Sequence, residues 1–402
     1  MRKALVIGGG IAGPVTALAL RRAGLKAEVF EAYDRTAEGV GAFLTLAANG
    51  VDALRTIGVD DLVLADAFDT PRMRLVSAGG STLADVSLGS RADGTVSRTV
   101  RRSSLYSALR AEAERVGVPV RYGRRLVDAT GTRAGVTAYF ADGTSAEGDV
   151  LVGADGLRSR TRAVIDPGAP PARYVGLLNV GGYARGVDVQ AEPGVMHMVF
   201  GKRCFFGYVQ HPDGEVWWFA NPASPSEEHG EAMARLSEHQ WREHLVDLLA
   251  GDRSPAVDLV RATPRLLAGW STYDFPTVPT WHRERMLIIG DAAHATSPAA
   301  GQGASQAIED AVVLAKCLRD MPDVEEALRT FESLRRERVE KVVQMGRRNG
   351  QHKSVGWFTR VVVVPLVFKL VARKGDPMAW ATDHHIDWDA PVIPALRPAQ
   401  SA

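Results

Sequence analysis

The sequence predicts an α/β fold of the βαβ type that begins near the N-terminus, is interrupted by a β-rich insertion, and resumes near residue 283. Three observations support this prediction. Residues 3–32 alternate strand, glycine turn, helix and strand. Residues 170–280 instead carry strand-like runs separated by turns such as "HPDG". A second strand, glycine turn and helix follow over residues 286–311.

The composition excludes several classes of protein. Of the 402 residues, 46% are hydrophobic and 24% are charged, as in ordinary globular chains. The 48 basic and 47 acidic residues give a net charge of +1, so no nucleic-acid partner is expected. Cys204 and Cys317 form no C-x-x-C pair, which argues against a zinc cluster or a redox dithiol. The histidines of "TDHHIDWD", residues 382–389, fit no metal spacing template, and no metal is predicted.

Neither a signal peptide nor a membrane span is expected. The first apolar run begins at residue 4, too early for a basic region and a cleavage site, so a cytoplasmic protein is predicted. The apolar segment 355–374 is interrupted by Arg360, Pro365 and Lys369, and a spanning helix needs about 20 apolar residues. Core or lid packing is therefore expected for this segment, without integral membrane association.

Each element of the first βαβ unit has a local signal. Residues 4–7 form an apolar run of strand length. Apolar residues then recur at helical spacing from Pro14, and Gly24 ends that helix. Residues 27–32 form the next strand.

The remaining elements follow from similar signals. Residues 50–65 and 101–117 are expected to be helical, the latter amphipathic. Short strands are expected over 72–100, and a hairpin with a "DG" turn over 136–156. A charged helix is expected over 326–348.

The first glycine turn has the spacing of a dinucleotide site. Gly8, Gly10 and Gly13 fit G-x-G-x-x-G, which permits a tight turn, a close approach to pyrophosphate, and packing of helix on strand. Ile11 and Ala12 lie at the start of the helix, whose free N–H groups and dipole favour an anion.

Glu31 completes this site at the end of the second strand, 18 residues after Gly13. A carboxylate at this place accepts hydrogen bonds from a ribose 2′-hydroxyl and disfavours a 2′-phosphate. The ligand is therefore NAD or FAD rather than NADP, and the pattern does not separate these two.

Three further motifs accompany the first: "VRRSSLYSAL" at 100–109, "GADGLRSRTR" at 153–162, and "GDAAHATSPAAGQGASQAIEDA" at 290–311. With them, nearly the whole chain resembles the group A, para-hydroxybenzoate hydroxylase-like, FAD-dependent monooxygenases. The resemblance implies a Rossmann-like FAD-binding domain of the GR2 type, interrupted by a β-sheet substrate domain and followed by C-terminal helices.

This resemblance implies a discontinuous division of the chain. The FAD-binding domain takes three pieces, 1–71, 101–169 and 281–350. The substrate domain takes the strands of 72–100 and the β-rich segment 170–280, and a C-terminal helical segment and tail takes 351–402.

The resemblance also implies one non-covalent FAD rather than two nucleotide sites. The first turn would hold its AMP half, and Asp291 would accept from a ribityl hydroxyl. Asp155 would act near the pyrophosphate and the transient NADH or NADPH. Arg102 matches the arginine of the family's Arg-x-x-Leu-x-x-x-Leu.

The loop before the last motif's helix is implied to meet the flavin ring. Pro298 would lie beside the ring, with Gly301, Gly303 and Ala304 at the helix N-terminus facing the flavin's pyrimidine edge. Free N–H groups there would stabilise the negative charge of reduced flavin. Ser305 departs from the family pattern, where asparagine is common.

The implied activity uses NAD(P)H and O2. A C4a-(hydro)peroxyflavin would hydroxylate or epoxidise an apolar, aromatic or polyketide-like small molecule. Since the cofactor carries the chemistry, the protein must bind, orient and exclude water, and no catalytic side chain is predicted.

Four aromatic residues of 170–280 are candidates for the substrate pocket: Phe206, Tyr208, Trp217 and Phe219. Alternate residues of a strand share a face, so Trp217 and Phe219 should face together while Trp218 faces away.

Alternatives remain open. A reductase or dehydrogenase of the same fold, acting on an isoprenoid-like substrate, is the runner-up, and a non-catalytic flavin-binding protein is a third possibility. A halogenase is disfavoured because "EVWWFANP" lacks W-x-W-x-I-P. Both a monomer and a homodimer are compatible with the sequence.

Overall fold

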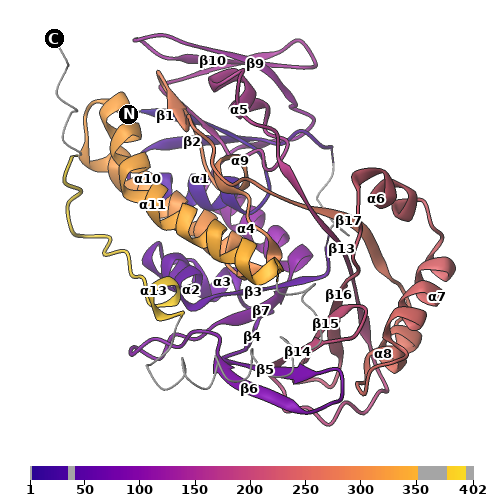
Figure 1. Cartoon of the computed structure of the whole chain (residues 1–402). Coiled ribbons are helices and arrows are strands. Elements are labelled where there is room, and N and C mark those ends of the chain that lie inside the picture. The colour runs from indigo at the N-terminus through magenta and orange to yellow at the C-terminus, as the bar shows by residue number, and fades with distance from the viewer. Residues whose placement is uncertain (1, 35–40, 352–377, 395–402) are drawn as a thin grey trace.

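A largely parallel sheet lies in the upper half of the molecule as drawn in Figure 1, and the computed structural model describes residues 2–34, 41–351 and 378–394. Its strand order is β18-β19-β12-β1-β2-β8, and only β18 is antiparallel to its neighbour. The strands are β1 (Lys3–Ile7), β2 (Lys26–Phe30), β8 (Val120–Arg121), β12 (Val150–Gly153), β18 (His282–Arg283) and β19 (Met286–Ile288). The predicted α/β class is confirmed.

Helices from both ends of the chain pack around this sheet. The long helix α10 (Gly303–Asp320) lies against α1 (Ala12–Arg22), and α11 (Val324–Gln351) runs along α10 (Figure 1). The buried residues Leu5, Leu18 and Ile308 belong to one apolar cluster. The shorter helices of this part are α2 (Ala48–Thr56), α3 (Asp60–Val63), α4 (Arg102–Arg115), α5 (Arg160–Ile165), α9 (Asp291–His294) and the 3₁₀ turn η1 (Pro298–Ala300).

Two small sheets flank the parallel sheet. One projects from the molecule with the order β11-β10-β9 (Figure 1), and the other has the order β3-β7-β4. Their strands are β9 (Leu126–Gly131), β10 (Val136–Phe140), β11 (Ser145–Gly148), β3 (Phe43–Leu46), β4 (Phe68–Asp69) and β7 (Arg98–Arg101).

A seven-stranded sheet with the order β17-β13-β16-β15-β14-β5-β6 is built from the two strand-rich segments. Because β5 pairs in parallel with β14, residues 72–77 join strands more than 110 positions later. The strands are β5 (Arg72–Ser77), β6 (Thr82–Ser87), β13 (Arg173–Ala184), β14 (Val195–Phe200), β15 (Phe205–Gln210), β16 (Val216–Asn221) and β17 (Leu267–Asp274).

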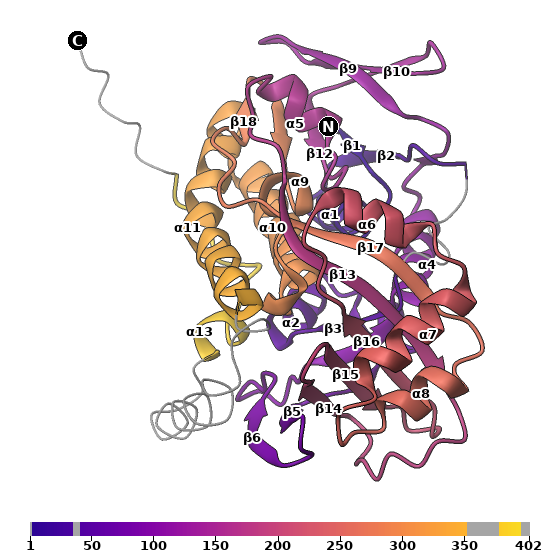
Figure 2. The same cartoon turned by 45° about the vertical axis from the view of Figure 1, so that its right-hand side comes forward.

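Three helices that the sequence analysis did not predict cover the outer face of this sheet (Figure 2). They are α6 (Glu227–Ala234), α7 (Glu238–Leu249) and α8 (Ala256–Ala262). A signal was present, because Ser237 and Gln240 form a complete capping box at the start of α7. Trp241 of α7 and Trp218 of β16 are buried in the apolar cluster beneath these helices.

His197 of β14 lies on this helix-covered face and gives the fold a pH dependence. It is stacked on Tyr208 at 4.7 Å and shares a 3.1 Å hydrogen bond between its Nδ1 and the tyrosine hydroxyl. Its Nε2 is buried without a partner among the described residues. Burial lowers the pKa of His197 to about 4.

We expect the free energy of unfolding to fall as pH drops from about 6.5 to about 4. In this range His197 is protonated in the unfolded chain but stays neutral in the folded chain. His197→Phe should flatten that decline by about 2 kcal/mol, since the ring can still stack but no longer titrates. Urea unfolding at several pH values measures this. The exposed His239 of α7 provides the control variant, His239→Phe, and an equal flattening in both variants would contradict the assignment.

Candidate functional site: a cofactor edge beside an aromatic sheet face

Three turns far apart in the sequence meet at one edge of the parallel sheet. Ile7 pairs with Gly153, and Gly153 pairs with Ile288. The carboxyl ends of these strands therefore coincide, which is where open α/β sheets bind ligands. The register brings the predicted motifs at residues 8, 155 and 290 together.

The glycines of the first turn differ in the space around them. Gly8 and Gly13 pack tightly against backbone, whereas Gly10 faces open space. A Cβ at Gly13 would lie 1.9 Å from the carbonyl oxygen of Gly8, so α1 can pack here only with glycine. Gly8 has a φ of +109°, and a Cβ on it would lie 2.4 Å from the carbonyl oxygen of Ala154. A Cβ at Gly10 meets nothing within 4 Å. This open side, in front of the half-buried Ile11 and Ala12, fits a pyrophosphate.

Glu31 is held across this turn by two backbone donors. Its Oε2 accepts from the N–H of Gly9 at 2.6 Å, and its Oε1 accepts from the N–H of Tyr33 at 2.9 Å. Each carboxylate oxygen keeps a second lone pair, so the side chain can still accept from a ribose hydroxyl.

Asp155 braces its own loop. Its carboxylate accepts from the Ser159 hydroxyl at 2.5 Å and from the N–H and hydroxyl of Thr161 at 2.9 and 3.0 Å. Its predicted contact with the cofactor and NAD(P)H stays a prediction. Arg162, which the sequence analysis did not single out, ties this loop to the third turn by donating to the carbonyl oxygen of Ala292 at 2.9 Å.

The third turn presents its predicted residues outward. Asp291 is exposed, and its carboxylate has no hydrogen-bond partner within the described parts of the chain. Pro298 and Gly301 are also exposed, and Gly301 has a φ of +62° with nothing within 4 Å of an added Cβ. Gly303 and Ala304 are half-buried at the start of the 18-residue helix α10.

Arg102 has a buried polar atom that a cofactor could pair with. It begins α4, and its terminal nitrogen donates to the hydroxyl of Tyr106 at 2.8 Å. Its Nε is buried with no partner among the residues described. Because a buried guanidinium N–H is seldom left unpaired, an anionic ligand such as a phosphate fits here.

A buried ionic cluster supports α10, and sequence reasoning missed it. Glu309 and Asp310 are fully buried and share Arg335, whose Nε lies 2.7 Å from the Oδ1 of Asp310 and whose Nη1 pairs with Glu309. His294 lies 2.6 Å from Asp310. Burial raises the pKa of Glu309, but Arg335 and Arg338 outweigh burial and hold that pKa at about 2. Glu309 is therefore ionised at neutral pH.

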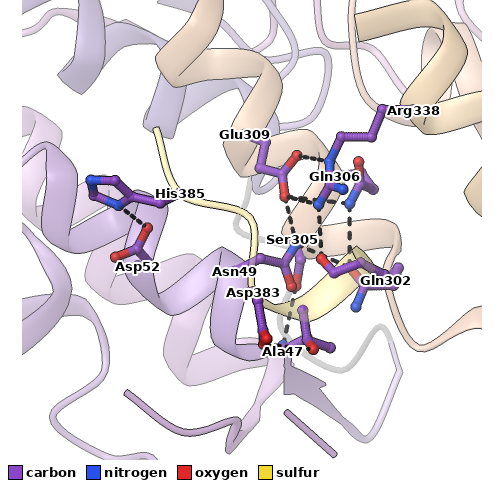
Figure 3. Close-up of polar contacts among 12 residues, drawn as sticks. Ala47, Asn49, Asp52, Gln302, Ser305, Gln306, Glu309, Arg338, Asp383 and His385 are labelled. Atoms are coloured by element: carbon purple, nitrogen blue, oxygen red, sulfur yellow. Dashed lines mark hydrogen bonds and ion pairs between the residues drawn. The ribbon is translucent and has the colours of Figure 1, made fainter. Parts of the chain in front are cut away.

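The cluster extends to the loop before α10 through amide side chains (Figure 3). The Nδ2 of Asn49 donates to Glu309 at 2.6 Å and to Gln302 at 3.1 Å. Gln306 donates to the same Oε1 of Gln302 at 3.3 Å. The Ser305 hydroxyl, where the family commonly has asparagine, accepts from the N–H of Ala47 at 3.1 Å.

The structure separates the four aromatic substrate candidates into two pairs. Phe206 and Tyr208 point to the helix-covered face of the large sheet and are buried with Trp218. Trp217 and Phe219 lie on the opposite face. Phe206 and Tyr208 therefore do not share a face with Trp217 and Phe219, because β15 is registered so that its odd-numbered residues lie on the face of Trp217.

The face of Trp217 and Phe219 carries aromatic rings beside β3, here called the aromatic surface, in which Trp217 is buried and the other rings are half-buried. Phe43 of β3 lies 5.7 Å from Trp217 and 6.0 Å from Phe219 between ring centroids. Tyr183 lies 5.4 Å from Trp217. Arg101 is stacked over Tyr183 at 4.3 Å, and Glu215 neutralises it in an ion pair. These aromatic rings, together with the Arg101–Glu215 ion pair, therefore lie beside β3, the strand that leads to Ala47.

A family model described as an FAD binding domain matches residues 1–346. The chain belongs to the group A flavoprotein hydroxylases. The FAD-dependent urate hydroxylase of Klebsiella oxytoca is 32% identical over 361 residues, covering 86% of this chain and 89% of that protein. The 3-amino-4-hydroxybenzoate 2-monooxygenase of Streptomyces cremeus is 30% identical, with 85% of each chain covered.

Comparison with a solved structure supports the same fold. Klebsiella pneumoniae HpxO complexed with FAD and uric acid has a TM-score of 0.80 and 26% identity, over 93% of this chain and 95% of that one. The predicted family, its FAD and its monooxygenase class are thus confirmed. Within the described residues, no helix has the length and hydrophobicity needed to cross a bilayer, and the segment 355–374 lies outside them.

Proposed function

We propose that this hydroxylase uses NADH or NADPH and O2 to insert one oxygen atom into an apolar, aromatic or polyketide-like small molecule, by hydroxylation or epoxidation. One atom of O2 enters the substrate, and the other leaves as water with the electrons of NAD(P)H. The bound flavin supplies the oxygen chemistry, while the protein binds and orients the substrate and excludes water.

The observation that carries the substrate class is the aromatic surface of Phe43, Tyr183, Trp217 and Phe219. Aromatic rings contribute large apolar contact areas and prefer edge-to-face contacts with other rings. The cation at this surface, Arg101, is already paired with Glu215 and stacked on Tyr183. An uncharged ring system therefore suits the surface better than a free carboxylate.

The aromatic surface is linked through β3 to the start of α10. Tyr183 donates its hydroxyl hydrogen bond to the carbonyl oxygen of Ala42 at 2.6 Å, which fixes the sheet against the start of β3. β3 then leads to Ala47, whose N–H is bonded to Ser305 of α10. This short connection supports a substrate that lies between the aromatic surface and the loop of residues 298–303 before α10. We call this loop the flavin loop.

The first experiment follows oxidation of NADH and NADPH by the FAD-loaded enzyme, with and without aromatic and polyketide compounds, and the mass of the products. A compound that accelerates oxidation and gains one oxygen atom supports the proposal. Oxidation that yields a reduced compound instead supports the reductase alternative. A flavin that neither nucleotide reduces would contradict the proposal.

Phe219→Ala should raise the KM for such a compound roughly tenfold, because the apolar contact of one ring is lost. Tyr208→Phe, on the helix-covered face, should leave that KM unchanged. Steady-state kinetics compare the two variants. A KM that changes in Tyr208→Phe but not in Phe219→Ala would place the substrate on the helix-covered face and would contradict the proposal.

A further inference from the structure

The C-terminal strap, defined as residues 378–394, crosses the outer side of α2, α10 and α11 (Figures 1 and 2). It contains one short helix, α13 (Ala379–Thr382). Basic side chains from other parts of the chain donate to its backbone carbonyl oxygens. They are Arg338 to Trp380 and Ala381, Arg91 to Asp383, Lys316 to Asp387, and Arg319 to Trp388.

One of these basic side chains also reaches the buried cluster under the flavin loop. Arg338 donates to the carbonyl oxygens of Trp380 and Ala381 at 2.9 and 2.8 Å. Its Nε and Nη2 bond to the two carboxylate oxygens of Glu309, each at 2.8 Å. A bidentate guanidinium fixes both the distance and the orientation of a carboxylate. Through Arg338, the strap therefore helps Arg335 to fix where Glu309 lies.

Glu309 in turn sets the place of the loop before α10. It binds the amide of Asn49, and Asn49 donates to Gln302 between Gly301 and Gly303. A chain of four contacts thus runs from the strap through Arg338, Glu309 and Asn49 to the flavin loop.

The strap also holds α2, the helix that carries Asn49. The Nδ1 of His385 lies 2.7 Å from the Oδ2 of Asp52, one helical turn after Asn49 (Figure 3). Thr56 donates to the carbonyl oxygen of Ile386 at 3.3 Å. The strap therefore contacts both partners of the Asn49–Glu309 hydrogen bond indirectly. It reaches Glu309 through Arg338, and it reaches the helix of Asn49 through Asp52 and Thr56.

We propose that the C-terminal strap is part of the cofactor site, and that Arg338 is the positioning residue through which it holds the Gly301–Gly303 loop against bound FAD. The inference rests on FAD binding, and it holds whichever substrate the enzyme oxidises. It extends the cofactor site to a segment that the FAD-binding family match at residues 1–346 does not cover.

The test compares Arg338→Gln with Arg338→Lys and with the control Arg336→Gln. Arg336 lies on the same helix, but its partners are Glu332, Glu340 and the carbonyl oxygens of Val278 and Pro279. For each variant, four quantities are measured on the full chain: the FAD dissociation constant, the visible circular dichroism of bound FAD, its reduction potential, and Tm.

Arg338→Gln should raise the FAD dissociation constant about tenfold, as expected for a lost hydrogen bond to a charged group. The visible circular dichroism should change and the potential should become more negative, because the α10 N-terminus no longer stabilises reduced flavin as well. Arg338→Lys should recover part of each effect, and Arg336→Gln should show none.

A lower Tm with unchanged flavin affinity, spectrum and potential would show that Arg338 only stabilises the fold, and would overturn the proposal. Should Arg338→Gln fail to fold, His385→Ala decides, because the hydrogen bond of its half-exposed side chain within the described residues is the one to Asp52. That variant should shift the flavin spectrum in the same direction by a smaller amount. An unchanged spectrum would likewise overturn the proposal.

Discussion

Replacing Gly13 with alanine should cost roughly 3 kcal/mol of folding free energy and abolish FAD binding, because its Cβ would be forced against backbone. The clash is with the carbonyl oxygen of Gly8 at 1.9 Å, and neither α1 nor the turn can yield without separating helix from strand. Urea unfolding and titration with FAD measure the two effects.

Gly10→Ala is the matched comparison, since both variants add one methyl group to the same turn. A Cβ at Gly10 meets no protein atom within 4 Å, so the FAD-free protein should keep its stability. The methyl group would occupy the space for pyrophosphate, and the FAD dissociation constant should rise about a hundredfold, or about 2.7 kcal/mol. Full FAD affinity in Gly10→Ala would show that the turn does not hold the pyrophosphate.

Arg335→Met should lower the free energy of unfolding by about 3–5 kcal/mol, the usual cost of leaving a buried charge without its partner. Arg335 is 1% exposed and compensates both Glu309 and Asp310. Arg338 and His294 remain near these acids, but neither bonds to both.

The loss should depend on pH with a definite sign. In the wild type, the pKa of Glu309 is held at about 2, below its ordinary 4.5, so its favourable contribution is present at neutral pH and is lost as pH falls from about 4.5 to 2. In Arg335→Met the pKa should rise, and protonation should relieve the variant. The two unfolding curves should therefore converge below pH 4.5.

Arg348→Met is the control for this loss, because Arg348 is exposed near the end of the same helix. It should change the unfolding free energy by less than about 0.5 kcal/mol. A similar loss in both variants would indicate that the length or charge of α11, rather than the buried cluster, sets the effect.

The fold and the cofactor edge could be predicted because their signals are local. A glycine turn between a strand and a helix can be recognised from about ten consecutive residues. The parallel register then brings Gly8, Asp155 and Gly290 together. Family resemblance supplied FAD, which the spacing alone left open against NAD.

What could not be predicted depends on contacts between distant segments. Glu309 and Asp310 fit the early turns of a helix whether exposed or buried, so their position in the sequence does not reveal a buried cluster. Their partner Arg335 lies 25 residues or more away on the next helix, at no recognisable spacing. The strand period placed Trp217 with Phe219, but it could not relate β15 to β16, so it could not show that Phe206 and Tyr208 lie on the other face.

The order of strands in the parallel sheet also governs when the enzyme can capture its cofactor. β12 lies between β1 and β19, so the binding edge joins residues near 7, 153 and 288. A chain emerging from the ribosome cannot assemble this edge until synthesis has passed residue 288. Such long-range strand pairing folds slowly, and unpaired strands are exposed meanwhile. FAD that binds only the finished edge then favours the folded chain by mass action. Flavin supply during synthesis thereby becomes a determinant of how much enzyme accumulates.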